Sequence, residues 1–150
     1  MEMSKLDQMV SDCAIEVLES MFFTSLAGDG ASCENPDGPW ISARLSFHGN
    51  PTGRFGVRTG LDTGRKIAAS FLGIEEDALT EPQIGEVVCE LANMLCGTVV
   101  SRLEEDSRFE LAPPSIDPPE AGCPECPTAR CAFELEEGRL AVWLELEKAG

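Results

Sequence analysis

The sequence predicts an α+β fold in which long helices pack on an antiparallel sheet. Three features carry this prediction: apolar residues at helical spacing in two long segments, alternating apolar and polar residues in two hairpins, and an order of elements that repeats. Each half of the chain runs from a long helix into antiparallel strands, so we expect an internal repeat of one structural unit. The length of 150 residues and the hydrophobic content of 43% suit a single domain, residues 1–150.

The first half is predicted to begin with a helix over residues 4–26. Its apolar residues recur at helical spacing, and Ser4 with Asp7 three positions later resembles a capping box. Five glycines and prolines between positions 28 and 39 predict a loop.

A hairpin and a short helix are expected next. Residues 41–47 and 54–59 alternate apolar and polar side chains on either side of a turn at 49–53. Asp62 or Thr63 is expected to cap the short helix, which should stop at Gly73.

The second half repeats this order. A helix is predicted over residues 81–105, with Pro82 in its first turn. A strand starting at Phe109 should break at Pro113 and Pro114, and a loop should follow over residues 115–128.

The chain is predicted to end in a second hairpin. Its strands are expected over residues 130–136 and 139–147, with a Glu-Gly turn between them. Residues 140–144 are continuously apolar rather than alternating, which predicts that this last strand is covered on both faces.

Charge and composition exclude several classes of function. A net charge of −16 would repel the phosphates of nucleic acid and favours a partner with a basic surface. No uninterrupted apolar run reaches the ~20 residues of a membrane span. The first residues lack the basic and apolar regions of a signal peptide. The expected location is therefore the cytoplasm, without a membrane partner.

The seven cysteines are not expected to form a disulfide framework, because the count is odd and the chain shows no export signal. Cys123, Cys126 and Cys131 could contribute to a zinc site, but a closed site needs four ligands. Cys33 would have to complete it from a distant loop. We therefore expect no bound metal, and a metal-stapled or thiol-sensing protein stays as an alternative.

The most informative segment lies within the second long helix. With Glu86 as the reference direction, Glu90 falls near ~40°, Asn93 near ~−20° and Gly97 near ~20° on a helical wheel. These four residues form one narrow stripe. The apolar residues face the opposite side: Ile84, Val87, Val88, Leu91, Leu95 and Val99.

The stripe has two interpretations. It is a solvated helix face, or it is a docking face that presents a carboxamide to a partner. Asparagine and glycine are poor residues for a helix interior, so their presence calls for a reason. A carboxamide can hold a water molecule, and a carboxylate can pair with a lysine or arginine. Such groups can orient water at a phosphate carried by another protein.

The first helix carries a related pattern. Asp12, Glu16 and Glu19 have the spacing of Glu86, Glu90 and Asn93, with a carboxylate in place of the carboxamide. This supports the repeated unit, although acidic residues every four positions are also common in helices.

The stripe residues resemble the signature helix of the CheC, CheX and FliY phosphatases of bacterial chemotaxis, most closely that of CheX. The family pattern is an aspartate or serine, three residues, a glutamate, two residues, an asparagine, and a later proline. Glu90 and Asn93 match it, Glu86 replaces the aspartate or serine, and Pro113 and Pro114 stand slightly early for the proline. The flanking segments agree in order and cover most of the chain.

This resemblance implies a function. Glu90 and Asn93 would enter the active site of a phosphorylated CheY-type response regulator. Asn93 would orient the attacking water, Glu90 would pair with the regulator's lysine, and Glu86 and Gly97 would border the contact. The magnesium ion would belong to the regulator, and this chain would bind no cofactor.

The resemblance also implies a single active stripe and a homodimer, as in CheX, because Glu19 replaces the second asparagine. The alternative is an adaptor without catalytic activity, which would dock on a response regulator or a flagellar switch component through the same face.

Overall fold

The protein's structure, a computed structural model, describes residues 5–21, 26–28, 39–49, 52–103, 108–117, 129–135 and 138–147. Its helices are α1 (Lys5–Met21), α2 (Leu61–Leu72) and α3 (Glu81–Leu103), with a 3-10 turn, η1 (Glu76–Ala78). Its strands are β1 (Leu26–Gly28), β2 (Trp40–His48), β3 (Gly53–Gly60), β4 (Glu110–Leu111), β5 (Ser115–Ile116), β6 (Ala129–Leu135) and β7 (Gly138–Leu146).

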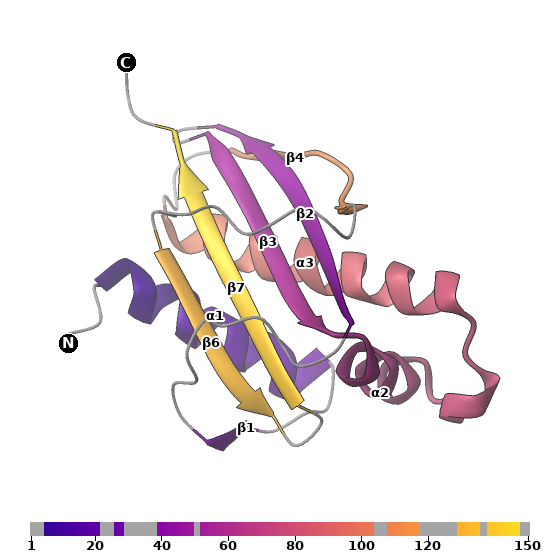
Figure 1. Cartoon of the computed structure of the whole chain (residues 1–150). Helices are drawn as coiled ribbons and strands as arrows, with labels where there is room; N and C mark the ends of the chain where they lie inside the picture. The colour runs from indigo at the N-terminus through magenta and orange to yellow at the C-terminus, as the bar shows by residue number, and fades with distance from the viewer. Residues whose placement is uncertain are drawn as a thin grey trace.

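The strands form one antiparallel sheet in the order β1-β6-β7-β3-β2-β4, with β5 beside β2. Figure 1 shows α1 crossing behind β6 and β7 and α3 crossing behind β2 and β3, while α2 lies at one end of the sheet. The predicted α+β architecture, with long helices on an antiparallel sheet, is confirmed.

The repeated unit is visible in the strand order. Each half supplies a long helix, a hairpin and at least one short strand, and the two hairpins meet at the centre through β3 and β7. The short strands are exchanged, because β1 pairs with the second half's β6 while β4 and β5 pair with the first half's β2. Neither half can therefore complete its share of the sheet alone.

The core lies between the sheet and the long helices. Alternate residues of the central strands point into it, as the period of two requires. Its largest fully buried side chains are Phe47, Phe55, Leu18, Ile67, Ile84, Leu91, Leu95, Leu140, Leu144, Val10 and Val57. Burial of this apolar surface, at about 25 cal/mol per Å², fixes α3 to the sheet with one face inward.

The opposite face of β7 is also covered. Trp143 is only 4% exposed, and Arg44 lies 5.5 Å from the centre of its ring. A Cβ atom at Gly56 would lie 2.2 Å from the Trp143 ring, so only glycine fits below it. The prediction that the last strand is covered on both faces is confirmed at this residue.

Two boundary predictions were wrong. Leu26 belongs to β1 rather than to the first helix, which is described as far as Met21. The second helix already begins at Leu61, after Gly60, which makes no side-chain cap. Its expected caps, Asp62 and Thr63, therefore lie in its first turn. Ser4, the cap expected for the first helix, lies outside the described residues.

The C-terminus of α2 and the N-terminus of α3 are both fixed by capping interactions. Gly73 ends α2 in the left-handed region with φ 68°, as predicted. At α3, the Thr80 N–H donates to Gln83 Oε1 at 2.8 Å and the Gln83 N–H donates to Thr80 Oγ1 at 3.3 Å. This reciprocal capping box, which the sequence analysis missed, places Pro82 in the first turn as predicted.

The long helix α3 is apolar enough, by length and composition alone, to count as a membrane-span candidate among the described residues. A core helix passes the same test, and 56% of its most apolar stretch is buried inside the fold. Packing on the sheet accounts for the hydrophobic character of α3.

Candidate functional site

The predicted stripe of Glu86, Glu90, Asn93 and Gly97, called the α3 stripe from here on, lies on the face of α3 that points away from the core. Glu86 and Glu90 are exposed, and Asn93 and Gly97 are half-buried. The intervening residues Val87, Leu91 and Leu95 are buried against the sheet. The structure thus brings the four predicted site residues together on one outer strip of a helix that the core holds in place.

The polar groups of the stripe have no partner within the described part of the chain. No hydrogen bond or ion pair there engages the side chain of Glu86, Glu90 or Asn93. Both carboxylates can therefore accept hydrogen bonds from a visiting cation, and the Asn93 carboxamide can both donate and accept.

The segment that carries β4 and β5 runs beside the stripe and forms a wall along it. A Cβ atom at Gly97 would lie 4.0 Å from Leu111 Cδ2, and one at Gly85 would lie 3.5 Å from Ile116 Cγ1. These are ordinary contact distances, so the fold itself has room for a methyl group at both glycines. The missing side chain of Gly97 leaves the outer surface flat beside Asn93.

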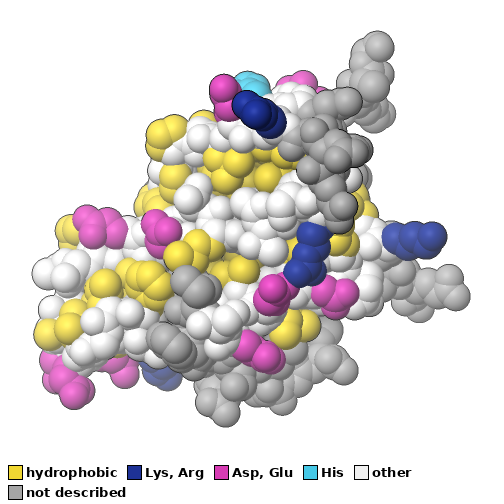
Figure 2. All heavy atoms as spheres, turned by 180° about the vertical axis from the view of Figure 1, so that it is seen from behind, with side chains coloured by type: hydrophobic (Ala, Val, Ile, Leu, Met, Phe, Trp, Pro, Cys, Tyr) yellow, Lys and Arg dark blue, Asp and Glu magenta, His cyan; other side chains and the backbone are white. Residues whose placement is uncertain are grey.

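A groove of about 940 Å³ separates the first half of α3 from this wall. The groove is lined by Ile41, Leu61, Glu81, Pro82, Gly85, Glu86, Cys89, Glu90, Pro114, Ser115 and Ile116. Figure 2 shows the helix side of the molecule, where hydrophobic side chains lie among acidic ones. Sequence reasoning missed this groove, because a two-residue strand has no measurable period.

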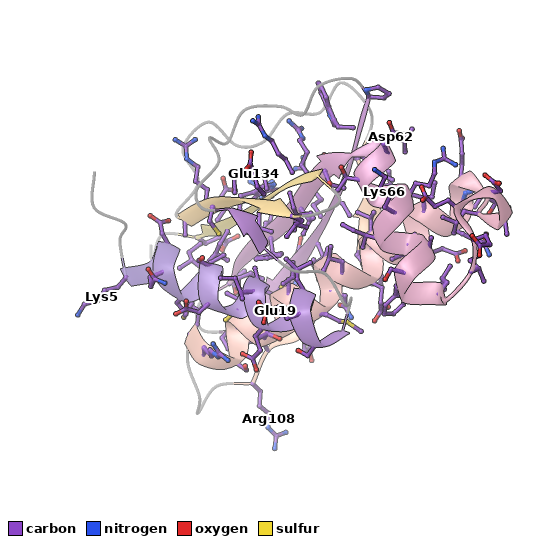
Figure 3. The ribbon with its side chains drawn as sticks, turned by 90° about the horizontal axis from the view of Figure 1, so that it is seen from below. Lys5, Glu19, Asp62, Lys66, Arg108 and Glu134 are labelled. Atoms are coloured by element: carbon purple, nitrogen blue, oxygen red, sulfur yellow. The ribbon has the colours of Figure 1, made fainter. Side chains whose placement is uncertain are left out.

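The corresponding stripe on α1 is arranged differently. The Glu16 carboxylate pairs with the Arg102 guanidinium of α3, and Asp12 accepts a hydrogen bond from Gln8 at 2.9 Å. Glu19 lies exposed on α1, which Figure 3 shows on the helix side of the sheet. Glu16, which is equivalent to Glu90, thus already forms an ion pair within the chain.

The described cysteines sit mostly in apolar surroundings. Burial raises the pKa of the Cys96 thiol to about 12 and also raises the pKa of Cys89, which lines the groove. Cys131 is buried in the core on β6. Cys33, Cys123 and Cys126 lie outside the described residues. Across the ranges that the structure covers, no group of three or more histidine, cysteine or acidic side chains could hold a metal ion.

Comparison with known proteins gives a family match. The family model described as "Chemotaxis phosphatase CheX" matches residues 41–133, which run from β2 through α3 to β6. No curated protein matches the chain.

Solved structures share the fold over nearly the whole chain. A chemotaxis protein CheX from Desulfovibrio desulfuricans has a TM-score of 0.74 at 19% identity, covering 96% of this chain and 100% of that one. The CheX of a CheX–CheY–BeF3–Mg complex from Borrelia burgdorferi has a TM-score of 0.72 at 16% identity, covering 94% and 97%. FliY from Thermotoga maritima has a TM-score of 0.55 at 14% identity, and the match covers 97% of this chain and 92% of that one.

Proposed function

This chain belongs to the family of the chemotaxis phosphatase CheX, and from that membership we propose that it hydrolyses the aspartyl phosphate of a CheY-type receiver domain. The observation that carries the proposal is the α3 stripe, which presents Glu90 and Asn93 outward with no partner in the described part of the chain. A solved complex in which another CheX is bound to CheY supports the class of partner.

The proposed reaction needs little covalent chemistry from this chain. Water attacks the phosphorus atom in line with the bond to the receiver's aspartate, that bond breaks, and the aspartate carboxylate and inorganic phosphate are released. A carboxamide does not titrate near neutral pH, so Asn93 is no general base. Its carbonyl oxygen accepts a hydrogen bond from the water and its N–H can donate to a phosphoryl oxygen, which fixes the attacking geometry.

Glu90 serves the complex by charge. It stands one turn before Asn93 on the same face, where its carboxylate can pair with a lysine of the receiver. Glu86 extends the acidic strip by one further turn, and Gly97 lets the receiver backbone approach the helix closely. These roles make the stripe a docking surface centred on one water-positioning amide.

The remaining features follow from the family membership. We propose that the magnesium ion of the reaction is held by the receiver, that the protein works in the cytoplasm, and that it is a homodimer with one active stripe per chain. The engagement of Glu16 by Arg102 supports a single stripe, because it removes the equivalent carboxylate on α1.

The direct test is a phosphate-release time course. Receiver domains of the host are phosphorylated one at a time and diluted into buffer with magnesium, with and without this protein. We expect one receiver, or a few, to lose phosphate faster in proportion to added protein. Unchanged release from every receiver would overturn the proposal.

The adaptor alternative is separated in the same experiment by measuring binding. If a receiver binds the protein and its phosphate is released at the unassisted rate, the α3 stripe is a docking face without catalysis. Binding together with acceleration supports the phosphatase.

A further inference from the structure

The groove beside the α3 stripe has an unusual apolar feature at its wall. Ile116 of β5 is 42% exposed and is one of three large hydrophobic side chains that are exposed in the described ranges, the others being Leu72 and Ile74. Ile116 alone among these lines the groove. It faces Ile41, Leu61 and the flat surface of Gly85.

The backbone at Ile116 is anchored on both sides of the exposed side chain. Its residue pairs with Ala43 in the sheet, and the next residue, Asp117, donates its N–H to the Ser42 carbonyl at 2.9 Å. The Asp117 carboxylate also accepts a hydrogen bond from Arg44 Nε at 2.6 Å. A backbone that is ordered before binding loses little conformational entropy when a partner covers it.

The rim of the groove carries charge of one sign. Glu81, Glu86 and Glu90 line it, and none of the lining residues that the structure describes is a lysine or arginine. This combination of an apolar floor with an acidic rim is complementary to an apolar surface segment that carries lysine or arginine. It disfavours an acidic peptide.

The groove is also continuous with the α3 stripe, because Glu86 and Glu90 belong to both. A receiver that pairs with Glu90 and reaches Asn93 therefore covers the groove as well. The stripe supplies the reacting geometry, whereas the groove offers side chains that can differ in shape from one partner to another.

We propose that this groove receives an apolar, lysine- or arginine-bearing segment of the same receiver domain, and that Ile116 sets which receiver is accepted. The inference rests on the proposed function and assigns it a specificity surface. Removing the apolar contact at Ile116 should weaken docking while leaving the step at Asn93 intact.

The test compares Ile116→Ser with Leu72→Ser. Leu72 is 41% exposed on α2 and does not line the groove, so it controls for the loss of an exposed aliphatic side chain. We expect Ile116→Ser to raise KM for the receiver about tenfold, equivalent to about 1.4 kcal/mol of binding free energy. The kcat should stay unchanged, and Leu72→Ser should match the parent protein in both constants.

Equal KM values for the two variants, with the parent protein active, would overturn the groove inference alone. A parent protein that accelerates no receiver would instead overturn the proposed function. Sedimentation of both variants tests a second copy of this chain as the occupant: if Ile116→Ser loses self-association and keeps its affinity for the receiver, the inference is wrong.

Discussion

Glycines in this fold fall into two groups, according to whether the chain itself needs them. Gly138 has φ 145°, and a Cβ atom there would lie 2.0 Å from Thr63 Oγ1. Gly56 has no room beneath the Trp143 ring. Gly97 is different, because its nearest neighbour would be 4.0 Å away and its helical backbone suits any residue. A residue that the fold does not require is a candidate for a role in docking.

We expect Gly97→Ala to stabilise the protein and weaken its docking. Alanine is favoured over glycine in a helix interior by about 1 kcal/mol, and the structure has room for the methyl group. The added methyl would hold the receiver away from Asn93. Denaturant unfolding should show the gain in stability, and receiver binding should show the loss. A variant that is more stable and binds as well as the parent would contradict the docking role.

The buried thiol of Cys96 makes the free energy of unfolding depend on pH in the alkaline range. Its pKa is about 12 in the folded protein because of burial, against 9.0 for an unperturbed thiol. Unfolding therefore releases a proton between pH 9 and 12, so the free energy of unfolding falls with rising pH in that window, by about 1.4 kcal/mol per pH unit.

The check is a series of denaturant melts from pH 7 to 10.5 on the parent protein and Cys96→Ala. The variant should be less stable at pH 7, because it leaves a cavity, and its stability should fall less steeply above pH 9. If the free energy of unfolding falls with pH equally steeply for both proteins, the Cys96 thiol is not the group responsible for the fall.

At the level of single residues, the sequence revealed the α3 stripe but not the groove. Glu90 and Asn93 were found because spacing on one helix is local information. Ile116 and Pro114 were not, because they meet α3 only through the pairing of β5 with β2, which joins residues more than 70 positions apart.

Among the elements, α3 is the one on which the proposed function depends, and its start is fixed by the Thr80–Gln83 capping box. We expect Thr80→Ala to lower the free energy of unfolding by about 1 kcal/mol. Thr98→Ala is the matched control in the same helix, since the Thr98 hydroxyl donates only to the Met94 carbonyl one turn earlier. If denaturant melts show the same loss of unfolding free energy for both variants, the cap is not what stabilises α3.

The long helices and both hairpins were predictable because their periods extend over many residues. The two- and three-residue strands are too short for such a period: β1 was read partly as helix and β5 as loop, whereas β4 lies within the strand predicted from Phe109. Their existence depends on the exchange of short strands between the two halves, which local patterns do not encode.

For the molecule as a whole, the position of the strand arginines relative to α3 bears on docking. Arg44, Arg58 and Arg130 alternate with core residues on their strands and so point to the side of the sheet opposite α3. The charged residues of the α3 stripe and of the groove lining, as far as the structure describes it, are all acidic. We therefore expect a basic surface of the proposed receiver to be attracted to the stripe and the groove, with an association rate that salt reduces.

The central claim is that the carboxamide of Asn93 positions water for hydrolysis of a receiver's aspartyl phosphate. The most direct measurement is single-turnover phosphate release from a saturated complex, with the parent protein, Asn93→Ala and Gln8→Ala. Gln8→Ala removes a carboxamide from the exposed face of α1 and is the matched control.

Asn93→Ala should reduce the acceleration by about 100-fold or more, because misplacing the attacking water loses most of the positioning effect. Its affinity for the receiver should stay within about threefold of the parent's, a difference of less than 1 kcal/mol. Gln8→Ala should release phosphate at the parent rate. Full acceleration by Asn93→Ala would contradict the account.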